Sequence, residues 1–174
     1  MRALLVPLGA LAVLLAGCST LQTGADYDHG TDFSRYRTYT FQEGTGKPSH
    51  PFVIERVHRA LTDILGSKGW REIPDGGDAI VVAHFHLDKQ IQMTTTGYGY
   101  GWYGWYGGMN TATTTVTEIP VGTLVIDVVD PVAKKLVWRG WGNDEVTSQR
   151  TPEEAELYAH EVLAKILENF PPAR

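Results

Sequence analysis

Two histidines and an aspartate at alternating positions form the most metal-like pattern in the chain. His84, His86 and Asp88 lie in a segment, 79–91, whose apolar and polar residues alternate. Alternate residues of a strand point to one face, so these three side chains share a face and offer the donor atoms of a zinc or copper site. The competing interpretation is the exposed face of an antiparallel sheet that helices cover on the other side. We favour the exposed face, because a metal site also needs partners that orient its ligands. No metal and no other cofactor is expected.

Cys18 is the one cysteine of the chain, and it follows the lipobox-like residues Leu15, Ala16 and Gly17. Residues 1–17 have the three parts of a secretory signal, namely a basic start, an apolar run and small residues before the cut. The apolar run is shorter than the ~20 residues that a membrane-spanning helix needs. The sequence therefore predicts that the signal peptide 1–17 is cleaved and that Cys18 carries acyl chains such as palmitate, which anchor it to membrane lipid.

An acylated Cys18 also implies a location. Ser19 stands where an aspartate commonly retains lipoproteins of Gram-negative bacteria in the inner membrane. We therefore expect a place in the bacterial cell envelope, on the inner leaflet of the outer membrane, facing the periplasm. Residues 18–25 are predicted to form a lipidated tether, and residues 26–172 a single domain.

The charge of the chain excludes some partners. Its 174 residues include 20 acidic and 15 basic side chains, which give a formal net charge of −5. A mildly acidic chain without a basic cluster is not expected to bind nucleic acid. The sequence also has no phosphate-binding glycine loop, nucleophile elbow or paired-histidine zinc helix, which are motifs of common enzyme classes. We expect no enzymatic activity.

Residues 97–108 contain only glycine, tyrosine and tryptophan. Glycine at this density opposes core packing because of its backbone entropy, so we predict the tip of a hairpin between strands over 79–91 and 111–118. The tip either has no role or binds a glycan, a bilayer interface or an envelope protein through its rings. The residues that would make this contact are Tyr98, Tyr100, Trp102, Tyr103, Trp105 and Tyr106.

The apolar periodicity predicts two helices and several strands. One helix is predicted to begin at Pro51, and a second follows the capping box of Thr151 and Glu154. Strands are expected over 35–41, 79–91, 111–118, 122–129 and 135–141, with a turn at Pro120. Together these elements predict an α+β fold, an antiparallel sheet of about five or six strands with two amphipathic helices packed on one face. The two apolar stripes are Val53, Val57, Ala60, Leu61, Ile64 and Leu65, then Ala155, Tyr158, Ala159, Val162, Ile166 and Phe170.

A second candidate cation site lies near the start of the domain, where Asp26, Asp28, His29 and Asp32 surround Gly30. Aspartates before a glycine commonly accept hydrogen bonds from local backbone amides, and the spacing is not that of a calcium loop. We therefore favour turns and a helix cap over a cation site.

Asp127, Asp130, Asp144 and Glu145 have the residue type for acid–base catalysis. A five-residue connection after the 122–129 strand would place Asp127 opposite Arg139 on the outer face. We therefore favour a cross-strand salt bridge and a solvated turn over a catalytic role. The residues predicted to share the inner face are Leu124, Ile126, Val128, Leu136 and Trp138.

Several segments together resemble one family, the bacterial lipoproteins of domain of unknown function 4136. The matching segments are Asp26-x-Asp28, Asp32-Phe33-Ser34-x-Tyr36-x-Thr38-Tyr39, Asp78-Ala79-Ile80-Val81-Val82, Gly122-Thr123-Leu124-Val125-Ile126-Asp127, Lys135-Leu136-Val137-Trp138-Arg139-Gly140 and Ile166-Leu167-x-x-Phe170-Pro171-Pro172. The resemblance implies an α+β domain with helices on an antiparallel sheet, and it brings no catalytic residues. The expected function is a non-enzymatic envelope binding or structural module, and the alternative is a metal-binding protein.

Overall fold

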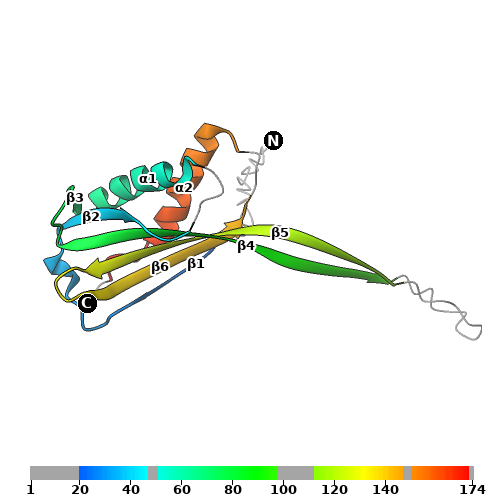
Figure 1. The fold of residues 1–174 in the computed structure, drawn as a ribbon, viewed down its shortest axis with the longest axis horizontal. Helices are drawn as coiled ribbons and strands as arrows, with labels where there is room; N and C mark the ends of the chain where they lie inside the picture. The colour runs from blue at the N-terminus through cyan, green and yellow to red at the C-terminus, as the bar shows by residue number, and fades with distance from the viewer. Residues whose placement is uncertain (1–19, 47–50, 98–111, 147–149, 173–174) are drawn as a thin grey trace, which may run out of the picture.

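The computed structural model describes residues 20–46, 51–97, 112–146 and 150–172. Within these ranges the chain forms one six-stranded sheet, in the order β1-β6-β5-β4-β2-β3, and both α-helices cover the same face of it (Figure 1). The α+β architecture with helices on one face is thus confirmed. The elements are β1 (Gln22–Tyr27), a 3-10 helix (Phe33–Arg35), β2 (Thr38–Glu43), α1 (Val53–Ser67), β3 (Arg71–Glu72), β4 (Ala79–Gly97), β5 (Ala112–Asp130), β6 (Lys135–Glu145) and α2 (Pro152–Ile166).

The sheet is mixed, not purely antiparallel as predicted. β1, β6, β5 and β4 pair antiparallel, whereas β2 runs parallel to both β3 and β4. The cause is α1, which follows β2 and returns the chain to the starting end of the sheet. Parallel neighbours require such a crossover connection.

The first element also differs from the prediction. Residues 22–25, expected to be part of the tether, belong to β1 and pair with β6 from Gln22 opposite Asn143 onward. An edge strand can be polar because much of its surface faces solvent, so the hydrophobic pattern does not reveal it.

Most residues of both predicted helix stripes are buried, but Val53, Ala155, Tyr158 and Ala159 are only partly buried. α1 starts at Val53 with Phe52 as its N-cap, two residues later than predicted from Pro51. The capping box of α2 is confirmed, because Thr151 and Glu154 exchange side-chain and backbone hydrogen bonds. The buried helix residues are Val57, Ala60, Leu61, Ile64 and Leu65 of α1 and Val162, Leu163 and Ile166 of α2.

A β-bulge changes the predicted register of β6. Asp127 is opposite Arg139 and Val128 is opposite Trp138, but the next pair is Val129 with Leu136. The extra residue of a bulge shifts the alternation of the strand beyond it. Leu136 is consequently 41% exposed, not on the inner face as predicted, and Val137 is buried instead.

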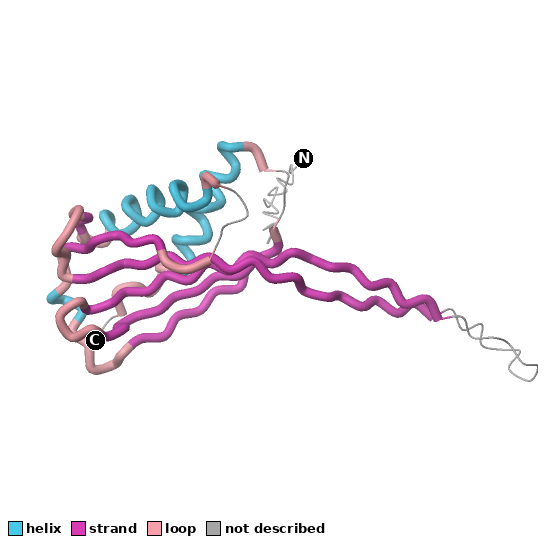
Figure 2. Tube along the Cα trace, in the orientation of Figure 1, coloured by secondary structure: helices cyan, strands magenta, loops and turns pink. Residues whose placement is uncertain are grey.

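β4 and β5 form a hairpin that extends far beyond the rest of the sheet, as Figures 1 and 2 show. Each strand has 19 residues, but β6 pairs with β5 only as far as Val121. Pro120, predicted to be a turn, lies inside β5 opposite Lys89. The Val146 amide donates to the Pro120 carbonyl at 2.8 Å, but Pro120 has no amide hydrogen to donate in return, so it lies where the pairing with β6 ends. We call residues 87–97 and 112–121 the arm.

Candidate functional site

A cleft of about 650 Å³ lies between the helices and the sheet at the base of the arm. Its deepest side chains are aliphatic or aromatic and come from four elements: Val57, Phe85, Leu124 and Val162 are all buried. The volume is within the range of roughly 300–1,000 Å³ that small-molecule sites occupy. The cleft also has Ala155 and Ala159 of α2 on its wall, and their short side chains leave space between α2 and the sheet.

Polar groups gather at the rim of the cleft, around Asp144. Its carboxylate accepts hydrogen bonds from Thr20 and from the hydroxyl of Tyr158. Burial raises the pKa of the Asp144 carboxyl, but these bonds, with the amide of Glu145 and the charge of Arg150, outweigh it and bring the pKa below its usual range. Asp144 therefore stays ionised at neutral pH and serves as a structural anchor for Thr20 and α2.

Exposed apolar side chains lie at the mouth of the cleft and, on the same face, farther along the arm. Leu87 lines the cleft and is 50% exposed. Ile91 and Met93 follow it at alternate positions of β4, and Val116 is paired with Met93. These three side chains are 60%, 69% and 56% exposed. Because alternate residues share a face, Lys89 lies on this face too, and its ion pair with Glu118 separates Leu87 from the exposed cluster of Ile91, Met93 and Val116.

The opposite, helix-free face carries the predicted salt bridge. Arg139 donates two hydrogen bonds of 2.6 Å to the carboxylate of Asp127, which is only 5% exposed. The cross-strand pair is thus confirmed, and bidentate geometry makes it one of the stronger ion pairs. Each oxygen of the Asp127 carboxylate thus accepts a hydrogen bond from Arg139.

His84 joins this pair instead of a metal site. Its Nδ1 accepts from the backbone amide of Thr45 at 3.0 Å, and its Nε2 lies 3.4 Å from Asp127 Oδ2. Both ring nitrogens therefore face protein partners. His86 and Asp88 are exposed, and within the described ranges no three His, Cys, Asp or Glu side chains are placed to hold a metal ion.

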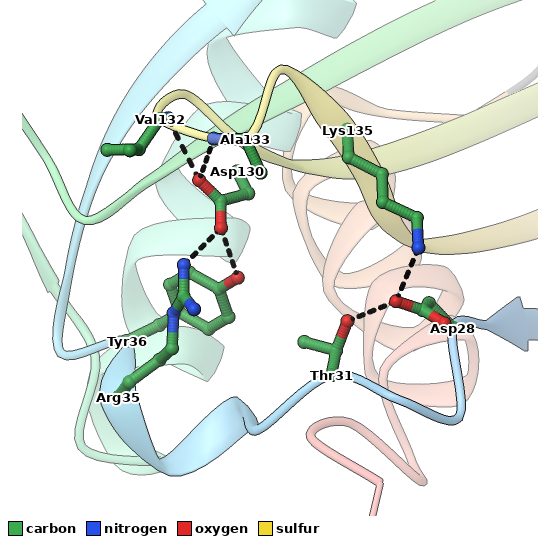
Figure 3. A network of polar contacts seen from close by, with 8 residues as sticks. All are labelled: Asp28, Thr31, Arg35, Tyr36, Asp130, Val132, Ala133 and Lys135. Carbon is green, nitrogen blue, oxygen red and sulfur yellow. Dashed lines mark hydrogen bonds and ion pairs between the residues drawn. The ribbon is translucent and has the colours of Figure 1, made fainter.

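Asp130, predicted to lie in a solvated turn, is buried. Figure 3 shows its carboxylate between two segments that are distant in sequence. One oxygen accepts from the amides of Val132 and Ala133 at 2.8 and 2.9 Å, and the other from Arg35 and from the Tyr36 hydroxyl. The side chain thereby fixes the β5–β6 turn to the 3-10 helix, which explains its burial.

The acidic residues near Gly30 form local turns, as favoured over a cation site. Asp28 accepts from the Gly30 amide, the Thr31 hydroxyl and Lys135. Asp32 caps the 3-10 helix by accepting from the Ser34 amide at 3.1 Å. Asp26 accepts from its neighbouring amide. His29 packs against the ring of Tyr27.

Two predicted sites lie outside the described residues. These are the lipidation site Cys18 and the aromatic segment with Tyr98, Tyr100, Trp102, Tyr103, Trp105 and Tyr106. The described part of the chain contains no helix long and apolar enough to cross a membrane. Thr20, bound to Asp144, is the first described residue, and Leu21 lines the cleft.

Sequence reasoning did not predict the cleft. Its lining comes from Leu21, three strands, both helices and the segment between β6 and α2. No single periodic pattern contains those residues. The one local signal was the pair of alanines, Ala155 and Ala159, at helical spacing on the core stripe of α2.

Comparisons with known proteins agree on the fold and assign no activity. The family model described as Domain of unknown function (DUF4136) matches residues 23–172. A search of the curated proteins finds no match. A PDZ domain protein from Parabacteroides distasonis has a similar structure, with a TM-score of 0.54 and 13% identity over 90% of this chain. This chain covers only 36% of that protein's length. A single-residue variant of the PelC dodecamer from Paraburkholderia phytofirmans is similar at a TM-score of 0.49 and 13% identity, over 84% of this chain and 95% of that one.

Proposed function

The chain belongs to the DUF4136 family, and we propose that it is a non-enzymatic, lipid-anchored binding module of the bacterial envelope. In this proposal Cys18 holds the chain in the inner leaflet of the outer membrane, facing the periplasm. The arm carries the contact surface, the aromatic segment 98–108, away from the domain and toward an envelope protein or glycan.

The observation that carries the proposal is the projection of the arm (Figure 2). From Asp88 to Gly97, β4 pairs only with β5. Ten strand residues extend about 30 Å at roughly 3.3 Å per residue. A two-stranded ribbon that leaves the sheet is only marginally stable by itself and adds little to the core. A binding role accounts for its length and for the exposed apolar side chains along it, because such patches mark interaction sites.

The position of the first described residues supports anchoring near the base of the arm. Thr20 is bound to Asp144 of β6, close to the pair of Val121 and Glu145 where the arm leaves the sheet. Cys18 is two residues before Thr20, a reach of at most about 7 Å. Acyl chains on Cys18 would therefore bring the base of the arm next to the bilayer.

Replacing residues 98–111 by Asn-Gly tests the role of the tip. Gly97 and Ala112 are paired, and Asn-Gly favours the tight turn that joins such strands, so the domain should fold unchanged. We expect pull-downs from crosslinked cells to lose a partner that the unaltered chain recovers. A full-length control replaces the six aromatic residues by serine and should lose the same partner. Unchanged recovery in both variants would contradict the proposal.

Anchoring has its own test. The Cys18→Ala variant should carry no acyl groups. Intact mass spectrometry of protein purified from the envelope should therefore show the added mass of the acyl groups on the unaltered protein and not on the variant. An unaltered chain without any added mass on Cys18 would refute anchoring while leaving the role of the arm open to the test above.

A further inference from the structure

We propose that the apolar cleft holds one acyl chain of an envelope lipid, drawn from the bilayer beside which Cys18 anchors the domain. This inference deepens the proposed function and rests on its anchoring step. It adds a second binding site to the module, distinct from the tip of the arm.

The lining of the cleft matches a hydrocarbon. Val57, Phe85, Leu124 and Val162 form its depth, and the described part of the chain has no buried side-chain polar atom without a hydrogen-bond partner. Against these four side chains a polar group would lose its hydration without compensation. A hydrocarbon loses nothing of this kind and gains from burial of its surface.

The size and shape of the cleft suit a long chain. A sixteen-carbon chain needs on the order of 500 Å³ if a methylene takes up about the 30 Å³ of a water molecule. The cleft offers about 650 Å³. Leu87 lies at its mouth, and the exposed Ile91 and Met93 follow on the same face of the arm beyond the Lys89–Glu118 ion pair.

The position of the cleft indicates that the acyl chain comes from a lipid of the bilayer. Leu21 is part of its lining, and Thr20 is bound to Asp144 at its rim. Cys18 is only three residues before Leu21, at most about 10 Å, so anchoring at Cys18 sets the rim against the bilayer. The charged residues of the rim are mixed in sign, with Arg56 and Arg150 beside Asp144 and Glu145. The rim therefore favours no particular head-group charge. Recognition of the lipid depends on its acyl chain.

The test uses the full chain purified from the envelope and placed in vesicles of phosphatidylethanolamine and phosphatidylglycerol. The vesicles contain a phosphatidylcholine with a photo-reactive diazirine on one acyl chain. After illumination, mass spectrometry of the peptides should locate adducts at Val57 of α1 and near Ala159 of α2, inside the cleft. Adducts confined to the arm, or none at all, would overturn the proposal.

Matched substitutions on α2 make the test specific. Ala159→Phe fills the cleft, and Leu157→Phe places the same ring on a residue that is 72% exposed. Each methylene of the acyl chain that the new ring excludes from the cleft lowers the affinity for the lipid on the order of fourfold. We therefore expect the yield of adducts to fall by about tenfold or more in Ala159→Phe and not in Leu157→Phe. Equal labelling of both variants rejects the cleft. Should Ala159→Phe unfold, Ala155→Phe, one turn earlier, makes the same comparison.

A second labelling experiment distinguishes an acyl chain of a bilayer lipid from the acyl group that the protein itself carries on Cys18. Cells fed a diazirine-bearing fatty acid would place the probe on Cys18. A crosslink from Cys18 to the cleft, without labelling by vesicle lipid, would show that the domain shelters its own anchor and overturn the bilayer source. Cleft adducts on a chain whose Cys18 has no acyl mass would instead refute only the proposed anchoring.

Discussion

Single charged residues near the turns hold together segments that are far apart in the sequence. Asp130 links the end of β5 to Arg35 and Tyr36, more than ninety positions earlier. The sequence placed this aspartate in a turn but not in the interior, because its partners precede β2 and no local pattern connects them to β5. Asp127 and Arg139 were predictable as a pair, since alternation and a short connection define their register.

The pKa of Asp130 leads to a prediction about stability. Donation by the Ala133 amide lowers the pKa of the carboxyl, burial opposes this, and Tyr36 and Arg35 lower it further, for a net decrease. A carboxyl whose pKa is lower in the folded than in the unfolded state stabilises the fold at a pH above its unfolded-state pKa of about 3.9. This contribution is lost as the pH falls through the folded-state pKa.

Asp130→Asn should therefore lower the free energy of unfolding at pH 7 by about 1–3 kcal/mol. It should also weaken the loss of stability that the unaltered chain shows below about pH 4. Urea unfolding between pH 3 and 7 measures both effects. Asp75→Asn is the control, because Asp75 is exposed and accepts from the neighbouring Gly76 amide. Equal stability of the two variants would rule out the structural role of Asp130.

At the scale of elements, close packing of α2 on β6 shapes both the core and the cleft. A Cβ on Gly140 would lie 2.2 Å from the ring of Trp138 and 2.7 Å from Ile166. The helix boundaries and stripes were largely predictable, because capping and 3.6-residue periodicity are local. The sequence did not predict the parallel pairing of β2, the bulge after Val128 or the strand β1. These features depend on which strands pair with one another, and such pairing is not encoded locally.

Gly140→Ala should destabilise the fold by about 1–3 kcal/mol, the usual cost of forcing extra volume into a packed core. Gly66→Ala is a matched control in α1, where the added Cβ meets nothing within 4 Å. That substitution should stabilise the chain by about 0.5–1 kcal/mol, because alanine favours a helix. Thermal unfolding of the two variants gives the comparison, and a neutral Gly140→Ala would contradict the close approach of α2.

At the scale of the whole molecule, the domain has one helix-covered end and one long arm (Figure 1). The hairpin was predicted from its glycine-rich middle, but not its length, because Pro120 suggested a turn where β5 continues. The mouth of the cleft lies at the base of the arm, at Leu87. Thr20 lies beside them through its bond to Asp144. We infer a module that is attached at this base and makes contact at its distant tip.

Crosslinking in intact cells, from a photo-reactive residue in place of Trp102, tests this account most directly. We expect one discrete protein or glycan adduct, identified by mass spectrometry and absent when the same residue replaces exposed Val132 on the β5–β6 turn. Adducts with lipid alone, or no adduct at Trp102, would contradict the proposal that the arm presents a contact surface to an envelope partner.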